Sequence, residues 1–447
     1  MPEPAAVAAD AATAADAASA GVVVVGAGLA GARTCQELRA AGHQGPITLI
    51  GDEAASPYDR PPLSKQAVDA TTGDLGFDAV ALNVDFRPDL RVTGLAGASR
   101  TADGPLQLAV AGHAPVLAEA VVVATGASPI VPPGWHLGDR VRTLRTRDDA
   151  IALATLVDAL GAQARFAVLG GSWIGMELAS RLAAAGIAVT VLEKAAWLLP
   201  QLPPEVGRQV RRWCDGAGVE VGLGLPVDGV TIGEAPRDGV VVATTGGGEV
   251  VADAALVALG VRPATGWLAD SGLGLSPRSG ALRVDQHLRS GDPRVIGVGD
   301  AVERWSPRYR AWLPGGHWQD ALDAPVVAAQ SVLAALAVTG PPPPAAYDAV
   351  PYFWSEMFGH TLQWTGFLTD YRSARLVVRG DMADGPWSVC WLDEHARLRG
   401  VLACDRPRDA VAARKAQAAD PGGAPEVDID ALADPQRAMR DCFVAGR

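Results

Sequence analysis

The stretch GVVVVGAGLAG, residues 21–31, joins a run of four valines to three glycines in the spacing GxGxxG. The valines predict a short buried strand, and the residues after the glycines predict a helix. Gly26, Gly28 and Gly31 allow a tight turn, close approach of a pyrophosphate to backbone N–H groups, and close packing of the helix on the strand. The order of strand, glycine turn and helix predicts the first half of a dinucleotide-binding unit.

A second strand and an acid complete this unit. The apolar residues 47–50, ITLI, predict the strand, and Asp52 and Glu53 follow it. Glu53 lies 22 residues beyond Gly31, which is the reach expected of an acid that binds a ribose hydroxyl group. The glycine spacing alone is a weak signal, but all of these features in order predict a bound dinucleotide.

The same pattern recurs at residues 166–194, FAVLGGSWIGMELASRLAAAGIAVTVLEK. Gly170 and Gly175 bracket the second turn, and Ser172 replaces the middle glycine with a residue small enough to fit. Glu193 ends the next strand, 18 residues after Gly175. Two such units in one chain imply two bound nucleotides.

The composition is that of a folded protein with more than one core. Of the 447 residues, 49% are hydrophobic, which suits two or three domains. The formal net charge of −12 argues against general binding to nucleic acid or to an anionic membrane surface. Residues 1–20 are alanine-rich without lysine or arginine, so we expect a disordered extension, or equally a frayed alanine-rich helix, and not a signal peptide. Because no apolar run reaches the roughly 18–20 residues that span a bilayer, we expect a soluble, cytoplasmic protein.

The scarce residue types limit the chemistry. Five cysteines are scattered without a CxxC pair, and their odd number suits a reducing compartment. The histidines form no known ligand spacing, so the pattern predicts no metal site. Lysine occurs only at positions 65, 194 and 415, which makes each lysine a candidate for chemistry that arginine cannot perform.

The two units together resemble the FAD-dependent pyridine nucleotide oxidoreductases, in which the first unit binds FAD and the second binds NAD(P)H. Within this resemblance AEAVVVATGASP is similar to the connection between the nucleotide domains, VALGVRP to the return crossover, and RVIGVGDAV to the second FAD motif. The aspartate of that motif would contact the ribityl and pyrophosphate region of FAD. The resemblance implies cofactor contacts at Ala124, Thr125, Gly126, Gly260, Gly299 and Asp300.

The segment PYDRPPLSK, residues 57–65, distinguishes this chain from the disulfide reductases of that family. Those enzymes carry a redox cysteine pair shortly after the first unit, whereas this chain has no cysteine between Cys35 and Cys214. The segment instead resembles the ferredoxin reductase branch. From the residues alone it could also be a rigid turn with Ser64 as the cap of the next helix, or an exposed polyproline segment.

The resemblance assigns roles around the flavin to this segment. Pro61 and Pro62 would form a rigid backbone beside the isoalloxazine ring. Arg60 would approach the FAD phosphates, and Lys65 would lie near the reactive N5 atom. Lys65 is expected to pair with Glu177, which makes these two the candidate catalytic residues; a plain interdomain salt bridge is the alternative. A movable ammonium suits N5 because the arrival of a hydride changes the local charge.

The C-terminal part also resembles this branch. PYFWS, residues 351–355, would place Trp354 against the flavin, although an ordinary core tryptophan is the alternative. Trp318 matches a tryptophan of the family, but residues 315–317 read Gly-Gly-His where relatives usually have an acidic residue just before it. This difference leaves contacts at the flavin edge and with the acceptor open.

These observations predict an α/β fold with two Rossmann-like domains and an α+β C-terminal domain. The FAD-binding domain is expected over residues 21–128 and 262–340, the NAD-binding domain over 129–261, and an interface domain over 346–447. The chain would be a monomer or a homodimer.

The resemblance implies NADH-dependent reduction of a [2Fe-2S] ferredoxin that supplies a cytochrome P450 or a Rieske oxygenase. NADH would pass a hydride to flavin N5, and the flavin would release single electrons to the cluster. Glu193 would favour NADH over NADPH by accepting a hydrogen bond from the adenosine ribose. An acidic ferredoxin would need a basic docking patch, for which the candidates are Arg304, Arg308, Arg310 and Arg372.

Two other functions fit the same pattern. One is an NADH oxidoreductase that reduces a small acceptor such as a quinone. The other is a scaffold resembling apoptosis-inducing factor, in which slow reduction by NADH drives dimerisation. Slow turnover with every acceptor, together with an NADH-dependent change in mass, would indicate the scaffold.

Overall fold

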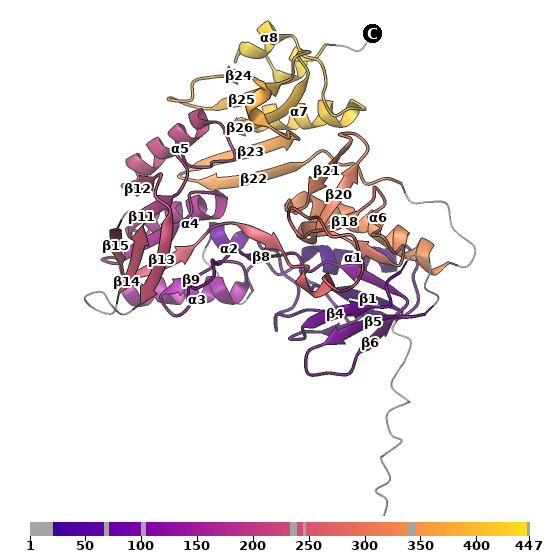
Figure 1. The fold of residues 1–447 in the computed structure, drawn as a ribbon. Coiled ribbons are helices and arrows are strands. Elements are labelled where there is room, and N and C mark those ends of the chain that lie inside the picture. Colours follow the sequence, from indigo (N-terminus) through magenta and orange to yellow (C-terminus); the bar gives the residue numbers. More distant parts are fainter. Residues whose placement is uncertain are drawn as a thin grey trace, which may run out of the picture.

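The computed structural model describes residues 21–66, 71–99, 104–232, 239–244, 247–337 and 345–444. Figure 1 shows two α/β bodies side by side and a third body above them. The extension expected at residues 1–20 lies outside the described residues. None of the described helices is long and apolar enough to cross a membrane.

The first α/β body contains a five-stranded parallel sheet in the order β19-β7-β1-β2-β3. Its strands are β1 (Val22–Val25), β2 (Ile47–Ile50), β3 (Asp85–Arg87), β7 (Ala120–Val123) and β19 (Val295–Gly297). All four valines of β1 are buried at the centre of the sheet, as expected of a parallel strand. Helices α1 (Leu29–Ala40) and α6 (Trp318–Leu336) pack against each other and against this sheet.

Smaller elements complete this body. An antiparallel sheet contains β4 (Val92–Ala96), β5 (Leu106–Val110) and β6 (Val116–Ala118). A second small sheet contains β18 (Leu282–Val284), β20 (Val302–Ser306) and β21 (Ala311–Pro314). The segment PYDRPPLSK leads into the one-turn helix α2 (Pro62–Lys65), so Ser64 lies inside this helix and does not cap it.

The second α/β body repeats the parallel sheet in the order β12-β11-β10-β16-β9. Its strands are β9 (Val141–Arg142), β10 (Arg165–Leu169), β11 (Ala188–Glu193), β12 (Glu220–Leu223) and β16 (Ala254–Val257). The helices of this body are α3 (Arg147–Leu160), α4 (Trp173–Ala184) and α5 (Pro204–Gly216). An antiparallel sheet of β13 (Val227–Ile232), β14 (Val240–Thr244) and β15 (Gly248–Ala252) adjoins it.

The chain passes between the two bodies twice, through a pair of short strands. β8 (Ala127–Pro129) and β17 (Val261–Pro263) run antiparallel to each other, so the outgoing and returning segments lie side by side. The two domain boundaries expected near residues 128 and 262 both fall inside these strands.

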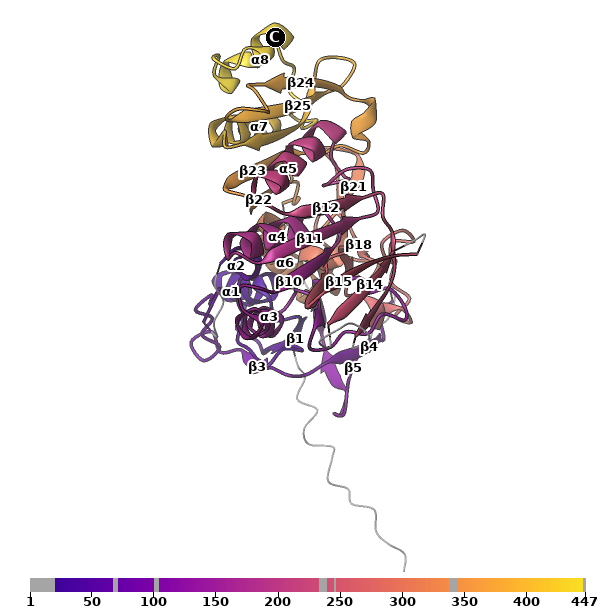
Figure 2. The same ribbon diagram turned by 90° about the vertical axis from the view of Figure 1, so that its left-hand side faces the viewer.

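The C-terminal body is a five-stranded antiparallel sheet in the order β22-β23-β26-β25-β24. Its strands are β22 (Tyr352–Met357), β23 (His360–Gly366), β24 (Arg375–Arg379), β25 (Trp387–Leu392) and β26 (Leu398–Cys404), and its helices are α7 (Pro407–Ala419) and α8 (Ile429–Ala433). Figure 2 shows this body stacked over helices α4 and α5 of the second body. Trp387 and Trp391 share one buried core with Met176 and Leu178, which fixes that contact.

Candidate functional site

A cavity of about 890 Å³ lies where the three bodies meet. This volume suits a large organic ligand, because such sites typically enclose about 300–1,000 Å³. The cavity is lined by most of the residues that the sequence singled out: Gly26, Gly28, Glu53, Arg60, Pro61, Lys65, Ala124, Thr125, Gly126, Glu177, Gly260, Gly299, Asp300, Trp318 and Trp354. Four others, Gly31, Gly170, Gly175 and Glu193, do not line it.

The first glycine turn forms one end of the cavity. Gly26 has φ +112°, and a Cβ atom there would lie 2.2 Å from the carbonyl oxygen of Ala124. A Cβ on Gly31 would lie 1.9 Å from the carbonyl oxygen of Gly26, so this glycine is needed for close packing of helix α1. A Cβ on Gly28, in contrast, would meet nothing within 4 Å, and no side chain caps the helix that follows. The turn therefore offers open space and unpaired N–H groups to a pyrophosphate.

The second glycine turn repeats this geometry. A Cβ on Gly170 would lie 2.4 Å from the carbonyl oxygen of Ala258, and a Cβ on Gly175 would lie 2.1 Å from that of Gly170. Glu193, at the end of β11, is buried beside this turn. Its carboxylate accepts hydrogen bonds from the N–H groups of Gly171 (2.7 Å) and Ala195 (2.8 Å). The acid is therefore fixed next to the turn, as a nucleotide ribose would require.

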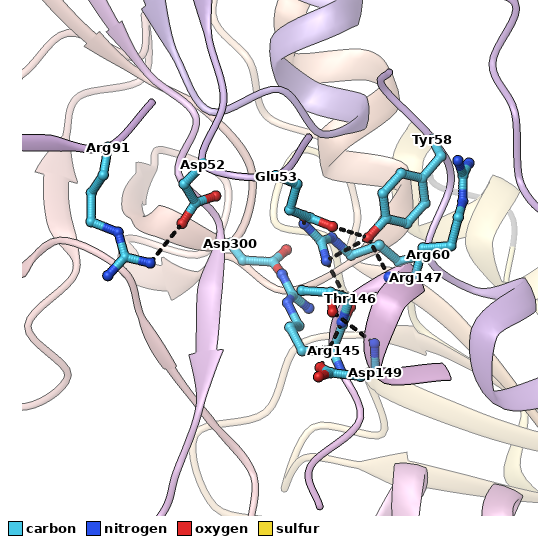
Figure 3. Close-up of polar contacts among 10 residues, drawn as sticks. All are labelled: Asp52, Glu53, Tyr58, Arg60, Arg91, Arg145, Thr146, Arg147, Asp149 and Asp300. Atoms are coloured by element: carbon cyan, nitrogen blue, oxygen red, sulfur yellow. Dashed lines mark hydrogen bonds and ion pairs between the residues drawn. The ribbon is translucent and has the colours of Figure 1, made fainter. Parts of the chain in front are cut away.

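A polar network surrounds Glu53 at the first site (Figure 3). The Glu53 carboxylate accepts hydrogen bonds from the Tyr58 hydroxyl (2.5 Å) and from Nη2 of Arg60 (2.8 Å). Arg60 also donates to the carbonyl oxygen of Arg145 (2.7 Å), and the Tyr58 hydroxyl accepts from the N–H of Arg147 (2.8 Å). Burial raises the pKa of Tyr58, so this hydroxyl keeps its proton and acts as a donor to Glu53.

Arg145 also lines the cavity, and the sequence reasoning did not single it out. Its Nη2 atom lies 3.0 Å from Oδ2 of Asp300 and close to the turn at Gly126. Its backbone N–H donates to Asp149 (2.9 Å), whose side chain also closes the N-terminal capping box of helix α3. The pKa of Arg145 is lowered, mainly by burial and next by the positive charge of the neighbouring Arg60. Two guanidinium groups therefore meet at the cavity wall, where a diphosphate would satisfy both.

Arg145→Met should weaken the binding of FAD by about tenfold or more, because a hydrogen bond to a charged group contributes about 1.5–3 kcal/mol and about 1.4 kcal/mol is tenfold. The measurement is the fluorescence of FAD released on dilution of the purified protein. Arg142→Met is the matched control, since Arg142 lies outside the cavity and bonds the carbonyl oxygen of Asp139 (3.0 Å). Equal release from both variants would contradict the role of Arg145.

Lys65 and Glu177 meet at the junction of the three bodies. Their ion pair is largely buried, with 15% of the Lys65 side chain and 6% of the Glu177 side chain exposed. Oε2 of Glu177 accepts from the hydroxyl of Ser64, and Oε1 accepts from both Lys65 and the hydroxyl of Ser355 (2.6 Å). The C-terminal body thus contributes a direct donor to Glu177, which the sequence reasoning did not identify.

Aromatic side chains form another wall of the cavity. The indole N–H of Trp318 bonds both carboxylate oxygens of Asp59 (2.8 and 2.9 Å), and its ring meets Trp354 edge-on at 5.5 Å. His317 stacks on Phe353 at 5.3 Å, and burial lowers the pKa of His317. The residue just before Trp318 is therefore a stacked histidine. The carboxylate that contacts Trp318 comes from Asp59, in another segment of the chain.

This fold and cavity define a class of two-nucleotide oxidoreductases. Two glycine turns end central parallel strands, an acid lies beside each turn, and a buried lysine–carboxylate pair lies between them. Residues 20–319 match the pyridine nucleotide-disulphide oxidoreductase family, and residues 352–443 match the reductase C-terminal family. The chain belongs to the pyridine nucleotide-disulphide oxidoreductase family, and its cofactors are FAD and NADH.

Named relatives span nearly the whole chain. The ferredoxin reductase component of chlorobenzene dioxygenase from Cupriavidus sp. (strain PS12) is 33% identical over 94% of this chain and 97% of its own length. The ferredoxin–NAD(+) reductase component of the anthranilate 1,2-dioxygenase system from Burkholderia cepacia is 34% identical over 92% of this chain and 97% of its own length. Among solved structures, the covalent putidaredoxin reductase–putidaredoxin complex matches with a TM-score of 0.81 and 26% identity, over 93% of this chain and 95% of that chain.

Proposed function

We propose that this protein is a cytoplasmic NADH-dependent reductase of a [2Fe-2S] ferredoxin that supplies a cytochrome P450 or a Rieske oxygenase. The observation that carries the proposal is the absence of a thiol at the cavity. No cysteine occurs among the described residues that line it, and all five cysteines are buried elsewhere as free thiols. The cavity residues therefore offer no dithiol through which electrons could pass to an acceptor. The similarity to ferredoxin reductase components supports a ferredoxin as the acceptor.

The binding roles follow from the two glycine turns. Residues 21–128 and 262–340 would hold FAD, residues 129–261 would hold NADH, and residues 346–447 would form the interface domain. Bound FAD would accept a hydride from NADH and deliver single electrons to the acceptor. Arg60 and Arg145 would neutralise the FAD pyrophosphate.

In this proposal Lys65 would be the cation beside the part of FAD that accepts the hydride. Glu177 holds its ammonium in place, and the hydroxyl groups of Ser64 and Ser355 hold Glu177. Pro61, at the start of helix α2, limits the movement of the backbone that carries the lysine. The aromatic wall with Trp318 and Trp354 would cover the flavin and exclude water.

The expected basic docking patch needs a correction. The prediction is wrong for Arg304, because its side chain is only 3% exposed, lies over the Tyr347 ring and bonds the carbonyl oxygen of Ala349 (2.8 Å). Arg308 donates to carbonyl oxygens at the end of helix α7. Its side chain therefore links the first body to the C-terminal body and is not a free surface cation. Arg310 and Arg372 are exposed and remain the candidates for docking an acidic ferredoxin.

Single-turnover kinetics test this function. Protein reduced anaerobically with one equivalent of NADH is mixed either with a [2Fe-2S] ferredoxin from an oxygenase system or with a soluble quinone. We expect the ferredoxin to oxidise the flavin at least about tenfold faster, and its rate to fall as salt screens the docking charges over a Debye length of about 10 Å at 0.1 M. Faster oxidation by the quinone would favour the small-acceptor function. Slow oxidation by both, with a doubled mass after NADH, would favour the scaffold.

A further inference from the structure

Three side chains that commonly bind metals lie together in the C-terminal body, away from the cavity. His360 begins strand β23, Cys404 ends strand β26, and Asp405 follows it. The two strands are antiparallel neighbours, with Leu362 opposite Cys404, so the pairing brings these distant residues together. Within the described residues, this is the one group of three histidine, cysteine or acidic side chains whose ligand atoms lie within 4.8 Å of one another.

The group is arranged with its thiol at the base and its other two members at the rim. Cys404 is 1% exposed, whereas about one third of the His360 and Asp405 side chains is exposed (35% and 33%). Nδ1 of His360 lies 2.7 Å from Oδ2 of Asp405, and the Cys404 sulfur lies 3.8 Å from the same oxygen. One side of the group is therefore open to solvent, so that an ion can enter.

Neighbouring contacts hold these side chains in place. The second carboxylate oxygen of Asp405 accepts the N–H of Thr361 (2.8 Å), and the N–H of Asp405 donates to the carbonyl oxygen of Thr361 (3.0 Å). The His360 ring stacks on Trp213 of helix α5 with ring centres 4.3 Å apart and planes 19° apart. Supporting contacts of this kind orient metal ligands in proteins.

We propose that His360, Cys404 and Asp405 form a binding site for Zn²⁺, with water as the fourth ligand. Imidazole nitrogen, thiolate sulfur and carboxylate oxygen are the three ligand types that zinc prefers, whereas a thiolate disfavours Mg²⁺ and Ca²⁺. On binding, the Cys404 thiol proton would pass to water, and the neutral His360 ring would bind through Nδ1 with its remaining proton on Nε2. None of the three residues lines the cavity, so the proposed site is separate from it.

The ligand atoms lie within 4.8 Å of one another, and two of their separations can be compared with those of a tetrahedral site. At the tetrahedral angle, zinc bonds of about 2.0–2.1 Å to nitrogen or oxygen and about 2.3 Å to sulfur place nitrogen and oxygen about 3.3–3.4 Å apart, and sulfur and oxygen about 3.5–3.6 Å apart. The sulfur–oxygen separation of 3.8 Å is close to its value in such a site, and the nitrogen–oxygen separation of 2.7 Å must open by about 0.6–0.7 Å. Because His360 and Asp405 lie at the exposed rim, small side-chain rotations supply that change.

A second histidine provides a matched control. His395 lies 3.5 Å from Glu394, and both side chains are highly exposed (75% and 86%). This pair has a histidine and a carboxylate but no thiol and no supporting stack. An exposed histidine that binds zinc only through its own ring would therefore behave like His395.

The test is a calorimetric titration of zinc sulfate into untagged, FAD-loaded protein that has been freed of metal with a chelator. We expect one saturable site. Removal of a direct ligand in His360→Ala, Cys404→Ser or Asp405→Asn should weaken binding by about tenfold or more, because even supporting contacts are worth about 10–100-fold in metal affinity. His395→Ala should bind as the wild type does.

Two results would overturn the site: no saturable binding by the wild type, or unchanged affinity in His360→Ala. If the buried Cys404→Ser variant does not fold, the two rim variants still decide the question, with thermal melting and FAD content as the folding check. A second measurement is the melting temperature of the wild type, which zinc should raise and which should not move in His360→Ala.

Discussion

Lys65→Met is expected to slow the reduction of bound FAD by NADH about a hundredfold, a loss comparable to that from removing one charge-stabilising donor from an enzyme site. Methionine keeps most of the length of the side chain but removes the ammonium. Lys65 lines the cavity and is held there by Glu177, so the variant removes the ammonium that this ion pair positions. The measurement is anaerobic stopped-flow absorbance of the flavin, and FAD content is expected to stay unchanged.

The structural contribution of the same ion pair can be separated from this effect. Among the described residues, Lys65→Met leaves the buried Glu177 carboxylate with the hydroxyl groups of Ser64 and Ser355, and loss of one partner of a buried pair destabilises a protein by about 3–5 kcal/mol. The double variant Lys65→Met/Glu177→Gln has no such unpaired charge. It should regain most of the stability in thermal melting and still reduce its flavin slowly. Recovery of the fast rate in the double variant would assign Lys65 a structural role alone.

The parts of the site that the sequence predicted are those set by local backbone geometry. Gly26 and Gly170 adopt positive φ beside a neighbouring strand, and Gly31 and Gly175 each approach the carbonyl oxygen of the glycine five residues earlier. These four positions cannot carry a side chain, whatever the arrangement of the rest of the chain. The glycines, together with the apolar strands before and after them and the acid that follows, were therefore enough to predict both turns.

The missed residues share a different property, which is that their partners are far away in the sequence. Ser355 bonds Glu177 across 178 residues, and Trp318 bonds Asp59 across 259 residues. Nothing near Ser355 or Asp59 signals such a contact, because the first joins two separate bodies and the second joins two distant segments of the first body. The error at Arg304 has the same origin: burial against Tyr347 and Asp320 depends on tertiary packing, while the local sequence suggested an exposed arginine. Tertiary proximity also unites His360 with Cys404 and Asp405.

Because of Glu193, we expect kcat/KM for NADH to exceed kcat/KM for NADPH by about ten- to a hundredfold. A hydrogen bond to a charged group contributes about 1.5–3 kcal/mol, and the 2′-phosphate of NADPH replaces that bond with about −1.5 to −2 units of charge near the same carboxylate. Glu193 is only 5% exposed, so little solvent would screen the repulsion. The N–H groups of Gly171 and Ala195 hold the carboxylate beside the turn and keep it from rotating away.

Lys194 is the competing influence, because it follows Glu193 directly and its side chain is exposed. Its ammonium could reach a 2′-phosphate and recover part of the lost affinity, but only by giving up its hydration and its freedom in solvent. The fixed carboxylate should therefore dominate.

Glu193→Gln keeps the size of the side chain and an acceptor oxygen while removing the charge. It should narrow the preference for NADH over NADPH at least about tenfold, since 1.4 kcal/mol is tenfold. Lys194→Ala is the matched control and should leave the preference unchanged or widen it. Steady-state kinetics with both nucleotides decide between the two residues: equal efficiencies in the wild type, or an undiminished gap in Glu193→Gln, would show that Glu193 does not select the nucleotide.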